Sequence, residues 1–316
     1  MQYRNLNLFS KQCIFIFVLM DMTKLILTTF FSVIVLLSSS QYNFDYGIKL
    51  GATNYLGDIG GQDKARRDFL MDMKLSQTQW VFGGYARYKF LPTLAGNVSI
   101  NYGRIQGDDA LSSNKGRNTR NLRFRNNILE ISAKAEYYIY EANDIGGKGR
   151  YMLDLKTYAH LGISVFNHNP KGSFDGSSWT SLQPLQTEGV NYSKWQIGIP
   201  VGAGVFFTYK NKHRLGWDFT WTVTFTDYLD DISTVFYQGP LEGNIGNQSG
   251  LTNADQQFLA NFDVGQKRGD PSHKDNYMFT TFSYGYLIRG RNSFYKKSYN
   301  FRRAKKKTAR KVRAKF

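Results

Sequence analysis

Eight segments between Tyr42 and Ile288 alternate apolar or aromatic residues with small, polar or charged ones. The clearest is 215–225, in which large apolar residues alternate with Gly, Asp and Thr. Successive side chains of a strand point to opposite faces, so each segment has one apolar face and one polar face. The apolar faces carry almost no charge, which is typical of a barrel whose outside contacts lipid. We therefore predict an all-β fold: an eight-stranded antiparallel transmembrane β-barrel with long extracellular loops and a basic C-terminal tail.

The connections between these segments are short and long in turn. The predicted strands cover about residues 42–54, 80–90, 94–105, 129–139, 153–165, 195–207, 215–225 and 275–288. The short connections are 91–93, 142–149 and 211–213, and the long ones are about 55–78, 106–126, 167–194 and 228–274. In bacterial barrels the short turns are periplasmic, the long loops are external, and an even strand number places both barrel termini in the periplasm.

The polar faces of the predicted strands carry charges of both signs in equal number. The acidic residues are Asp45, Glu130, Glu136, Asp154 and Asp218. The basic residues are Lys49, Arg87, Lys89, Lys134 and Lys156. Buried charges need partners, and an eight-stranded barrel is only wide enough to hold its own side chains. We predict a salt-bridged interior rather than a pore.

Composition agrees with a barrel in a membrane. Aromatic residues make up 16% of the chain, which fits aromatic girdles at two membrane interfaces. The mean hydropathy is only −0.43, a value typical of soluble proteins. Barrel strands give such values because half of each strand is polar. The predicted location is the cell outer membrane.

The front of the chain has the layout of a signal peptide. A short basic start at Met22-Thr23-Lys24 is followed by an apolar run and by Ser38-Ser39-Ser40. We expect residues 22–40 to be a signal peptide cleaved near Gln41, and the barrel to occupy 41–290. A transmembrane helix is the alternative, but the apolar run is too short for one.

Residues 1–21 are interpreted as an upstream extension of the gene model, with Met22 or Met20 as the true start. The only cysteine of the chain, Cys13, lies in this part. We therefore expect no disulfide and no thiolate metal site in the exported protein.

The basic character of the chain lies mainly in its last 26 residues. The net charge is +17, and residues 291–316 contain twelve Lys and Arg and no acidic residue. We predict a basic periplasmic tail that binds partners through charge. The candidate partner-binding residues are Arg302, Arg303, Lys305, Lys306, Lys307, Arg310, Lys311 and Arg313. An exported chain does not meet nucleic acid, so lipid headgroups, cell-wall polymers and acidic protein surfaces are the anions available.

The sequence offers little catalytic chemistry. Its histidines, His160, His168, His213 and His273, are not spaced as a metal pair. Ser164 and His160 share one strand face but lie about 13 Å apart, too far for a nucleophile and its base. We predict no catalytic residues, no metal and no cofactor.

Two groups of charged residues leave binding open at the outer strand ends. Asp108-Asp109 and Asp230-Asp231 could bind a divalent cation, although exposed acidic loop residues are common. The basic run from Arg117 to Arg125 could contact outer-leaflet phosphates or an acidic partner.

Five motifs, taken in order, resemble the PorG-like outer-membrane β-barrels of Bacteroidota. They are Tyr55-Leu56-Gly57-Asp58, Gly83-Gly84-Tyr85-x-Arg87-Tyr88, Tyr102-Gly103-Arg104-Ile105-x-Gly107-Asp108-Asp109, Arg120-Asn121-Leu122-Arg123-Phe124-Arg125-Asn126 and Asp275-x-Tyr277-Met278-Phe279. The resemblance covers about residues 44–288, and the basic tail is not part of it.

The resemblance implies a non-enzymatic component of the type IX secretion and gliding apparatus. Members of that family are expected to tie a periplasmic ring, built of a lipoprotein and its partner of the PorK/PorN or GldK/GldN type, to the outer membrane. The main alternative is a binding or adhesion barrel that meets a surface ligand with its long external loops.

Overall fold

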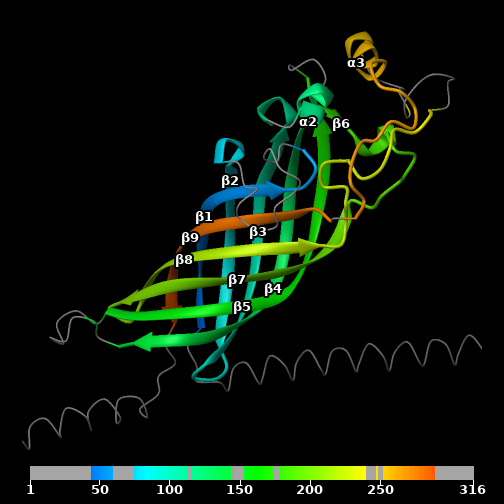
Figure 1. The fold of residues 1–316 in the computed structure, drawn as a ribbon. Coiled ribbons are helices and arrows are strands. Elements are labelled where there is room, and N and C mark those ends of the chain that lie inside the picture. The colour runs from blue at the N-terminus through cyan, green and yellow to red at the C-terminus, as the bar shows by residue number, and fades with distance from the viewer. Residues whose placement is uncertain are drawn as a thin grey trace, which may run out of the picture. The chain divides into compact units, whose positions relative to one another are not determined.

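Eight long antiparallel strands close into a barrel in the computed structural model (Figure 1). Their hydrogen-bonded order is β4-β3-β2-β1-β9-β8-β7-β5, and β4 also pairs with β5, which closes the ring. The strands are β1 (Phe44–Leu56), β2 (Gln79–Lys89), β3 (Leu94–Asp108), β4 (Arg123–Ala142), β5 (Leu153–Gly172), β7 (Trp195–Tyr209), β8 (His213–Thr224) and β9 (Asn276–Ile288). A two-residue strand, β6 (Thr180–Ser181), pairs antiparallel with the last residues of β5. The predicted eight-stranded antiparallel β-barrel is confirmed.

The structure describes residues 44–59, 75–112, 115–143, 145, 153–173, 178–239, 247, 252–272 and 274–288. The predictions of an upstream extension, a signal peptide and a basic tail fall outside these residues.

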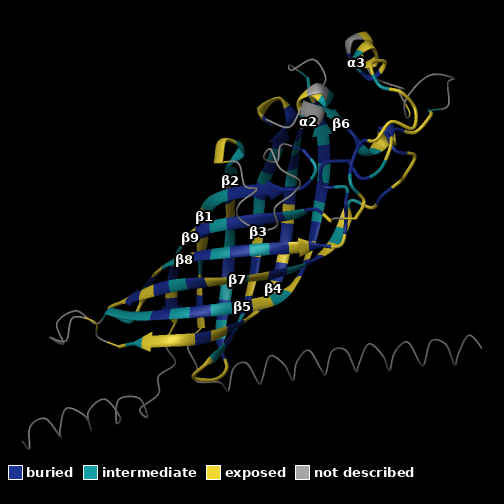
Figure 2. Ribbon diagram, viewed as in Figure 1, coloured by how far each residue is buried: buried dark blue, intermediate teal, exposed yellow. Residues whose placement is uncertain are grey.

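More exposed and more buried residues alternate along the barrel strands (Figure 2), and the exposed ones are largely apolar. Ile163 and Phe282 are 68% and 67% exposed, whereas the polar residues between outward positions, such as Thr222 and Glu130, are inaccessible. Exposed apolar side chains occur on every long strand. Such a surface is stable only in lipid, and closed barrels of even strand number are the β-structures that span the outer membrane. The chain is an outer-membrane β-barrel.

Both barrel termini lie at one end, because Phe44 pairs directly with Ile288. The short connections at 90–93, 143–152 and 210–212 lie at this same end. The four long connections lie at the opposite end, where Figure 1 shows β6, α2 and α3. By the rule for bacterial barrels, the end with short turns faces the periplasm. We call the two ends the periplasmic end and the outer end.

The strands β4 and β5 extend further toward the outer end than predicted. Each contains 20 residues, and they pair as far as Phe124 with Gly172. The prediction placed 123–126 and 167–172 in loops. It was wrong because the pattern inverts above the membrane: the inward residues Phe124 and Phe166 are apolar there, and the outward residues are polar.

The connections at the outer end contain short helices. These are η2 (Leu75–Gln77), η3 (Asp109–Leu111), α2 (Lys115–Arg120), η4 (Gln183–Leu185) and α3 (Asn253–Leu259). A capping box formed by Thr252 and Asp255 fixes the start of α3. Within the described residues, no helix has the length and apolar character needed to cross a membrane.

Candidate functional site: the barrel interior and the outer cap

Arg87 is the centre of a buried charge network at the membrane level. Its Nε lies 2.6 Å from Glu136 Oε2, and its Nη1 lies 3.4 Å from Asp45 Oδ2. Asp45 also pairs with Arg214, which is only 4% exposed. Asn97 donates to the other oxygen of Glu136 at 2.5 Å. The ion pairs thus run from Glu136 to Arg87, from Arg87 to Asp45 and from Asp45 to Arg214, which offsets the cost of removing all four charges from water.

A second group of interior charges surrounds Asp218. The Lys134 ammonium lies 3.8 Å from Asp218 Oδ1, and His160 Nε2 lies 3.3 Å from Oδ2. The Tyr158 hydroxyl donates to the same Oδ2 at 2.7 Å. His160, which the sequence placed on the inward face, therefore contacts a carboxylate. Its contacts among the described residues are with Thr220 and Asp218, and none of them places it as a general base beside Ser164.

Glu130 completes the interior network nearer the outer end. Its oxygens accept hydrogen bonds from Tyr277 at 2.6 Å, from Asn101 at 3.0 Å and from Thr222 at 3.3 Å. Glu130 is held by neutral donors rather than by a cation. The side chains of this network are almost wholly inaccessible, so the barrel is filled at this level and offers no aqueous pore.

Of the four remaining predicted interior charges, Lys49 is buried with its ammonium group 5.3 Å from the Tyr85 ring centroid, and the other three lie toward the periplasmic end. Lys89 and Lys156 are buried, and Glu141 lies 4.0 Å and 2.8 Å from their ammonium groups. Asp154, by contrast, is the second residue of β5 and is half-buried. Sequence reasoning missed Glu141 and Arg214 because it ended one strand at Ile139 and began another at Leu215.

A second core closes the outer end of the barrel. We call the described parts of the long connections, within 57–59, 109–122, 173–194 and 225–275, the outer cap. Loop and strand residues share one buried apolar cluster: Tyr55, Ile59, Val81, Ile105, Leu122, Phe124, Ile128, Phe166, Leu229, Ile232, Tyr277 and Phe279. Sequence reasoning did not predict this core, because its residues are scattered over several loops and inverted strand ends.

Arg120 ties three loops of the outer cap together. Its Nε and Nη2 bind the Asp109 carboxylate at 2.7 and 3.1 Å. Its Nη2 also donates to the Asp58 carbonyl at 3.0 Å, and its Nη1 donates to the Arg268 carbonyl. The four contacts use the guanidinium as a rigid connector between segments far apart in sequence.

Arg268 likewise connects separate segments of the outer cap. It pairs with Asp231 at 3.2 Å and with Glu188 at 3.4 Å, and it donates to the Thr187 hydroxyl. Glu188 also accepts the backbone N–H groups of Ser233 and Thr234, both at 2.9 Å. Sequence reasoning missed Arg268 and Glu188, since isolated charges in long loops carry no periodic signal.

Three carboxylates, Asp58, Asp230 and Asp275, lie close together under the outer cap. The Tyr55 hydroxyl donates to Asp275 at 2.7 Å, and the N–H of Ile59 donates to Asp230 at 3.2 Å. Burial, followed by the charge of Asp58, raises the pKa of Asp230 well above its usual range. Burial, followed by the charge of Asp230, raises the pKa of Asp275 in the same way. Each group therefore favours its protonated form more in the folded cap than in an unfolded chain.

The raised pKa values predict that the outer cap loosens as the pH rises. A carboxyl group whose pKa is raised by folding binds more protons in the folded state, so its contribution to stability is lost as the pH rises from about 3.9 through the raised value. We expect backbone hydrogen exchange at Leu229 and Ile232, corrected for intrinsic rates, to be faster at pH 8 than at pH 5. Asp58→Asn should reduce this difference because it removes the repelling charge.

Amides in the centre of β3 serve as the internal reference for that measurement, since they lie in the barrel wall. Greater protection of Leu229 and Ile232 at pH 8 than at pH 5 would contradict the predicted direction. An unchanged difference in Asp58→Asn would show that the charge of Asp58 does not raise the pKa of Asp230.

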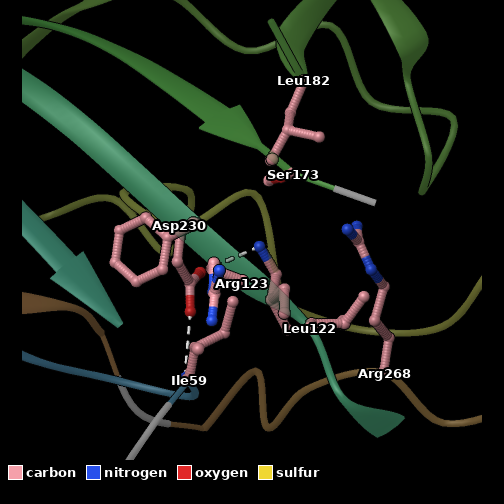
Figure 3. A pocket seen from close by; sticks show the side chains of 10 residues that line it. Ile59, Leu122, Arg123, Ser173, Leu182, Asp230 and Arg268 are labelled. Atoms are coloured by element: carbon pink, nitrogen blue, oxygen red, sulfur yellow. Dashed lines mark hydrogen bonds between the residues drawn. The ribbon is translucent and has the colours of Figure 1, made fainter. Parts of the chain in front are cut away.

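A small cavity lies inside the outer cap beside these carboxylates (Figure 3). Ile59, Leu122, Asp230 and Arg268 are among its lining residues, and the dashed line to Ile59 marks its hydrogen bond to Asp230. The cavity has a volume of about 10 Å³, which is room for about one water molecule. Pockets for organic ligands are about 300 Å³ or larger, so this cavity is not one of them.

The acidic pairs considered for a cation bind the protein instead. Asp108 pairs with Arg123 at 2.7 Å, and Asp109 pairs with Arg120. Asp231 accepts from Thr187 and Tyr192, both at 2.7 Å. In the part of the chain that the structure describes, no group of three or more His, Cys, Asp or Glu side chains is arranged to hold a metal ion.

Comparison with known proteins identifies the family. Residues 23–238 match the family described as "Domain of unknown function (DUF6089)", which is more than half of the chain. The chain belongs to the DUF6089 family. The matched region contains the Arg87 and Asp218 networks and ends before Arg268 and Asp275, which complete the outer cap. No curated protein sequence matches this DUF6089 protein.

Several solved outer-membrane proteins resemble this DUF6089 protein at low identity. Ail, the attachment invasion locus protein of Yersinia pestis, is 10% identical with a TM-score of 0.36, over 77% of this chain and 98% of Ail. A major outer membrane protein of Thermus thermophilus is 12% identical with a TM-score of 0.34, over 78% and 99% of the two chains. Neisserial surface protein A is 9% identical with a TM-score of 0.33, over 77% and 96%. The fold assignment rests on the strand pairing described above.

Proposed function

We propose that this DUF6089 protein is a non-enzymatic scaffold of the type IX protein secretion and gliding apparatus. It links the periplasmic ring lipoprotein and its partner to the outer membrane. The proposal rests on the motifs that resemble those of the PorG-like barrels, because the structure brings these motifs into contact. Four of the five motifs join in one chain of hydrogen bonds under the outer cap.

That chain of contacts runs through residues from each of these four motifs. Tyr55 donates to Asp275, and the N–H of Asp58 donates to the Tyr55 hydroxyl at 3.2 Å. Arg120 then connects the Asp58 carbonyl to the Asp109 carboxylate. The remaining motif, at 83–88, contributes Arg87 to the interior network. These residues contact one another and share their burial and charge. Motifs that are connected in this way support a fold shared with that family better than scattered identical residues do.

The filled interior supports a scaffold over a transporter. Arg87, Glu136 and Asp218 are buried and paired, so a solute has no path through this level of the barrel. Contact with other proteins is then left to the two ends. At the periplasmic end, Phe90 and Leu91 are half or more exposed in the turn between β2 and β3, and Lys210 and Lys212 lie in the turn between β7 and β8.

We expect the full chain, purified from outer membranes under mild conditions, to retain the two ring proteins. Truncation at Arg291 should leave the barrel as heat-stable as before but reduce the amount of ring protein retained, because twelve basic residues are removed. Contacts made by an exposed basic tail are screened, so retention should also fall as the salt concentration rises.

A matched variant tests the periplasmic turns separately. Lys210→Gln with Lys212→Gln removes charge from one turn and leaves the tail intact. Retention that is insensitive to salt and to the truncation would assign docking to the turns at 91–93 and 211–213. Failure of the full chain to retain ring proteins would overturn the proposal, and cleavage of the tail by protease added to intact cells would overturn the periplasmic topology.

The ordered outer cap favours adhesion as the second candidate function. It exposes Val190, Val235 and Tyr237 while the ion pairs of Arg268 hold the segment beneath them. Deletion of residues 228–274 would remove the buried Leu229 and Ile232 and destroy the cap. Tyr237→Ser is therefore the sharper test: an adhesin should lose attachment to its surface ligand, and a scaffold should keep its ring proteins.

A further inference from the structure

Three basic side chains face outward on neighbouring strands near the outer end. They are Arg104 on β3, Arg125 on β4 and Lys171 on β5. Each has the parity of the exposed apolar residues of its strand, and its sequence neighbours Ile105, Phe124 and Gly172 are buried. The three side chains therefore lie on the outside of the barrel wall and not in the interior network. We call them the wall cluster.

The wall cluster lies just beyond the apolar band. Along β3 the outward residues are Val98, Ile100 and Tyr102, and then Arg104. Along β4 and β5 the apolar outward positions end at Leu129 and Val165, and polar residues follow toward Arg125 and Lys171. A transmembrane barrel changes from apolar to polar where the lipid headgroups begin, so the wall cluster lies at headgroup depth.

Two tryptophans support this depth and position the guanidinium groups. The Arg104 guanidinium lies 5.7 Å from the ring centroid of Trp80, and the Arg125 guanidinium lies 4.3 Å from that of Trp179. Tryptophan is enriched at the boundary between hydrocarbon and headgroups. Arg104 Nε also donates to Asn127 Oδ1 at 2.9 Å. The two guanidinium groups are held on the wall instead of extending into solvent.

The charges of the wall cluster are not neutralised within the described chain. Arg125 is directly opposite Lys171 in the strand register, and Arg104 is diagonal to Arg125. Like charges at such positions, with Cβ atoms about 5–8 Å apart, destabilise a sheet. None of the three forms an ion pair with residues that the structure describes, whereas nearby Arg123 is paired with Asp108.

The wall cluster is confined to one side of the barrel. At the outer ends of β7, β8 and β9, residues 195–199, 219–224 and 276–280 contain no Lys or Arg. A general attraction to an anionic leaflet would call for basic residues around the whole circumference of the barrel. Three adjacent cations on one side fit a single anionic group.

We propose that Arg104, Arg125 and Lys171 bind a phosphate group of a phosphorylated glycolipid in the outer leaflet. Guanidinium forks bind phosphate oxygens in pairs, and an ammonium group adds a third positive contact. The site opens sideways at headgroup depth, two outward positions beyond the exposed Ile100 and Leu129, where acyl chains of the same lipid would pack. This inference goes beyond the proposed scaffold function and does not depend on it.

The test is lipid binding by the full chain in phosphatidylcholine nanodiscs. The probes are diphosphorylated lipid A, the same lipid A with both phosphates removed, and inorganic phosphate, with bound lipid counted by native mass spectrometry. The triple variant Arg104→Gln, Arg125→Gln, Lys171→Gln should bind diphosphorylated lipid A about 10- to 100-fold more weakly than the wild type. Dephosphorylated lipid A should bind both proteins equally weakly.

The matched control is Lys194→Gln, Lys267→Gln, Lys274→Gln, which removes the same charge from loops of the outer end. It should bind like the wild type. The variant Arg104→Lys with Arg125→Lys keeps the three positive charges and should bind diphosphorylated lipid A more tightly than the triple variant. It provides a second comparison if the triple variant folds poorly. Equal binding by the triple variant and the loop control would overturn the site. Wild-type binding of dephosphorylated lipid A at full strength would overturn phosphate recognition, and displacement of lipid A by equimolar inorganic phosphate would overturn a lipid source.

Discussion

Replacing Arg87 with Met is expected to destabilise the folded barrel by about 3–5 kcal/mol. The substitution removes the guanidinium that lies between Glu136 and Asp45, and Arg214 remains as a partner for Asp45 alone. Glu136, which is 1% exposed, would then lose the ion pair that it forms with Arg87. The measurement is reversible urea unfolding in lipid vesicles, followed by the difference in gel mobility between folded and unfolded barrels.

A double variant separates the lost ion pair from lost packing. The guanidinium of Arg87 also lies 4.8 Å from the Phe206 ring centroid and 5.2 Å from that of Tyr158, so Met retains part of its packing. Arg87→Met combined with Glu136→Gln should be more stable than Arg87→Met alone, because no unpaired carboxylate is left. Equal stability of Arg87→Met and the wild type would mean that the network adds nothing to the fold.

The membrane-level part of the barrel was predictable from the sequence because one physical rule governs it. Lipid requires apolar side chains at every second position, and the filled interior requires small, polar or paired residues at the others. Trp217, Phe219 and Trp221 obey the rule, and the outward face of β8 was assigned from the alternation of large apolar residues with Gly, Asp and Thr over 215–225. The charges on the inward face were found in the same way.

The rule fails where strands leave the membrane. Above Leu129 the outside of β4 leaves the apolar band and the inside meets the outer cap, so polar residues such as Arg125 face outward and Phe124 faces inward. A prediction that equates apolar with outward ends the strand too early. The inverted pattern is itself periodic, and a search for a change of phase would have extended β4 and β5.

The contacts of the outer cap lay beyond the reach of periodicity. Arg120 was noted as part of a basic run, but its partners are Asp109 at the start of the same connection and the carbonyl groups of Asp58 and Arg268 in two other segments. Such long-range junctions depend on how loops of irregular backbone pack, and no local spacing reports them. The acidic pair Asp108-Asp109 was considered as a cation site for the same reason, because the sequence spacing does not show which basic residues pair with it.

Replacing Phe219 with Arg is expected to destabilise the barrel in lipid by about 2–4 kcal/mol. Phe219 lies in the middle of β8, opposite Ala203 on β7 and Thr280 on β9, and it faces outward. Its position near the bilayer midplane gives a charged side chain the longest distance to either headgroup region. The penalty should therefore grow when unfolding is measured in vesicles with longer acyl chains.

The neighbouring substitution Thr220→Arg provides the control for this face assignment. Thr220 is 3% exposed and faces the interior, where its hydroxyl donates to Asp218 at 2.7 Å and accepts from Lys134 at 3.3 Å. An arginine there overpacks the interior and adds a cation beside Lys134, so its cost should not change with acyl chain length. If Phe219→Arg folds like the wild type while Thr220→Arg depends on bilayer thickness, then the face that carries Trp217 and Trp221 does not contact lipid.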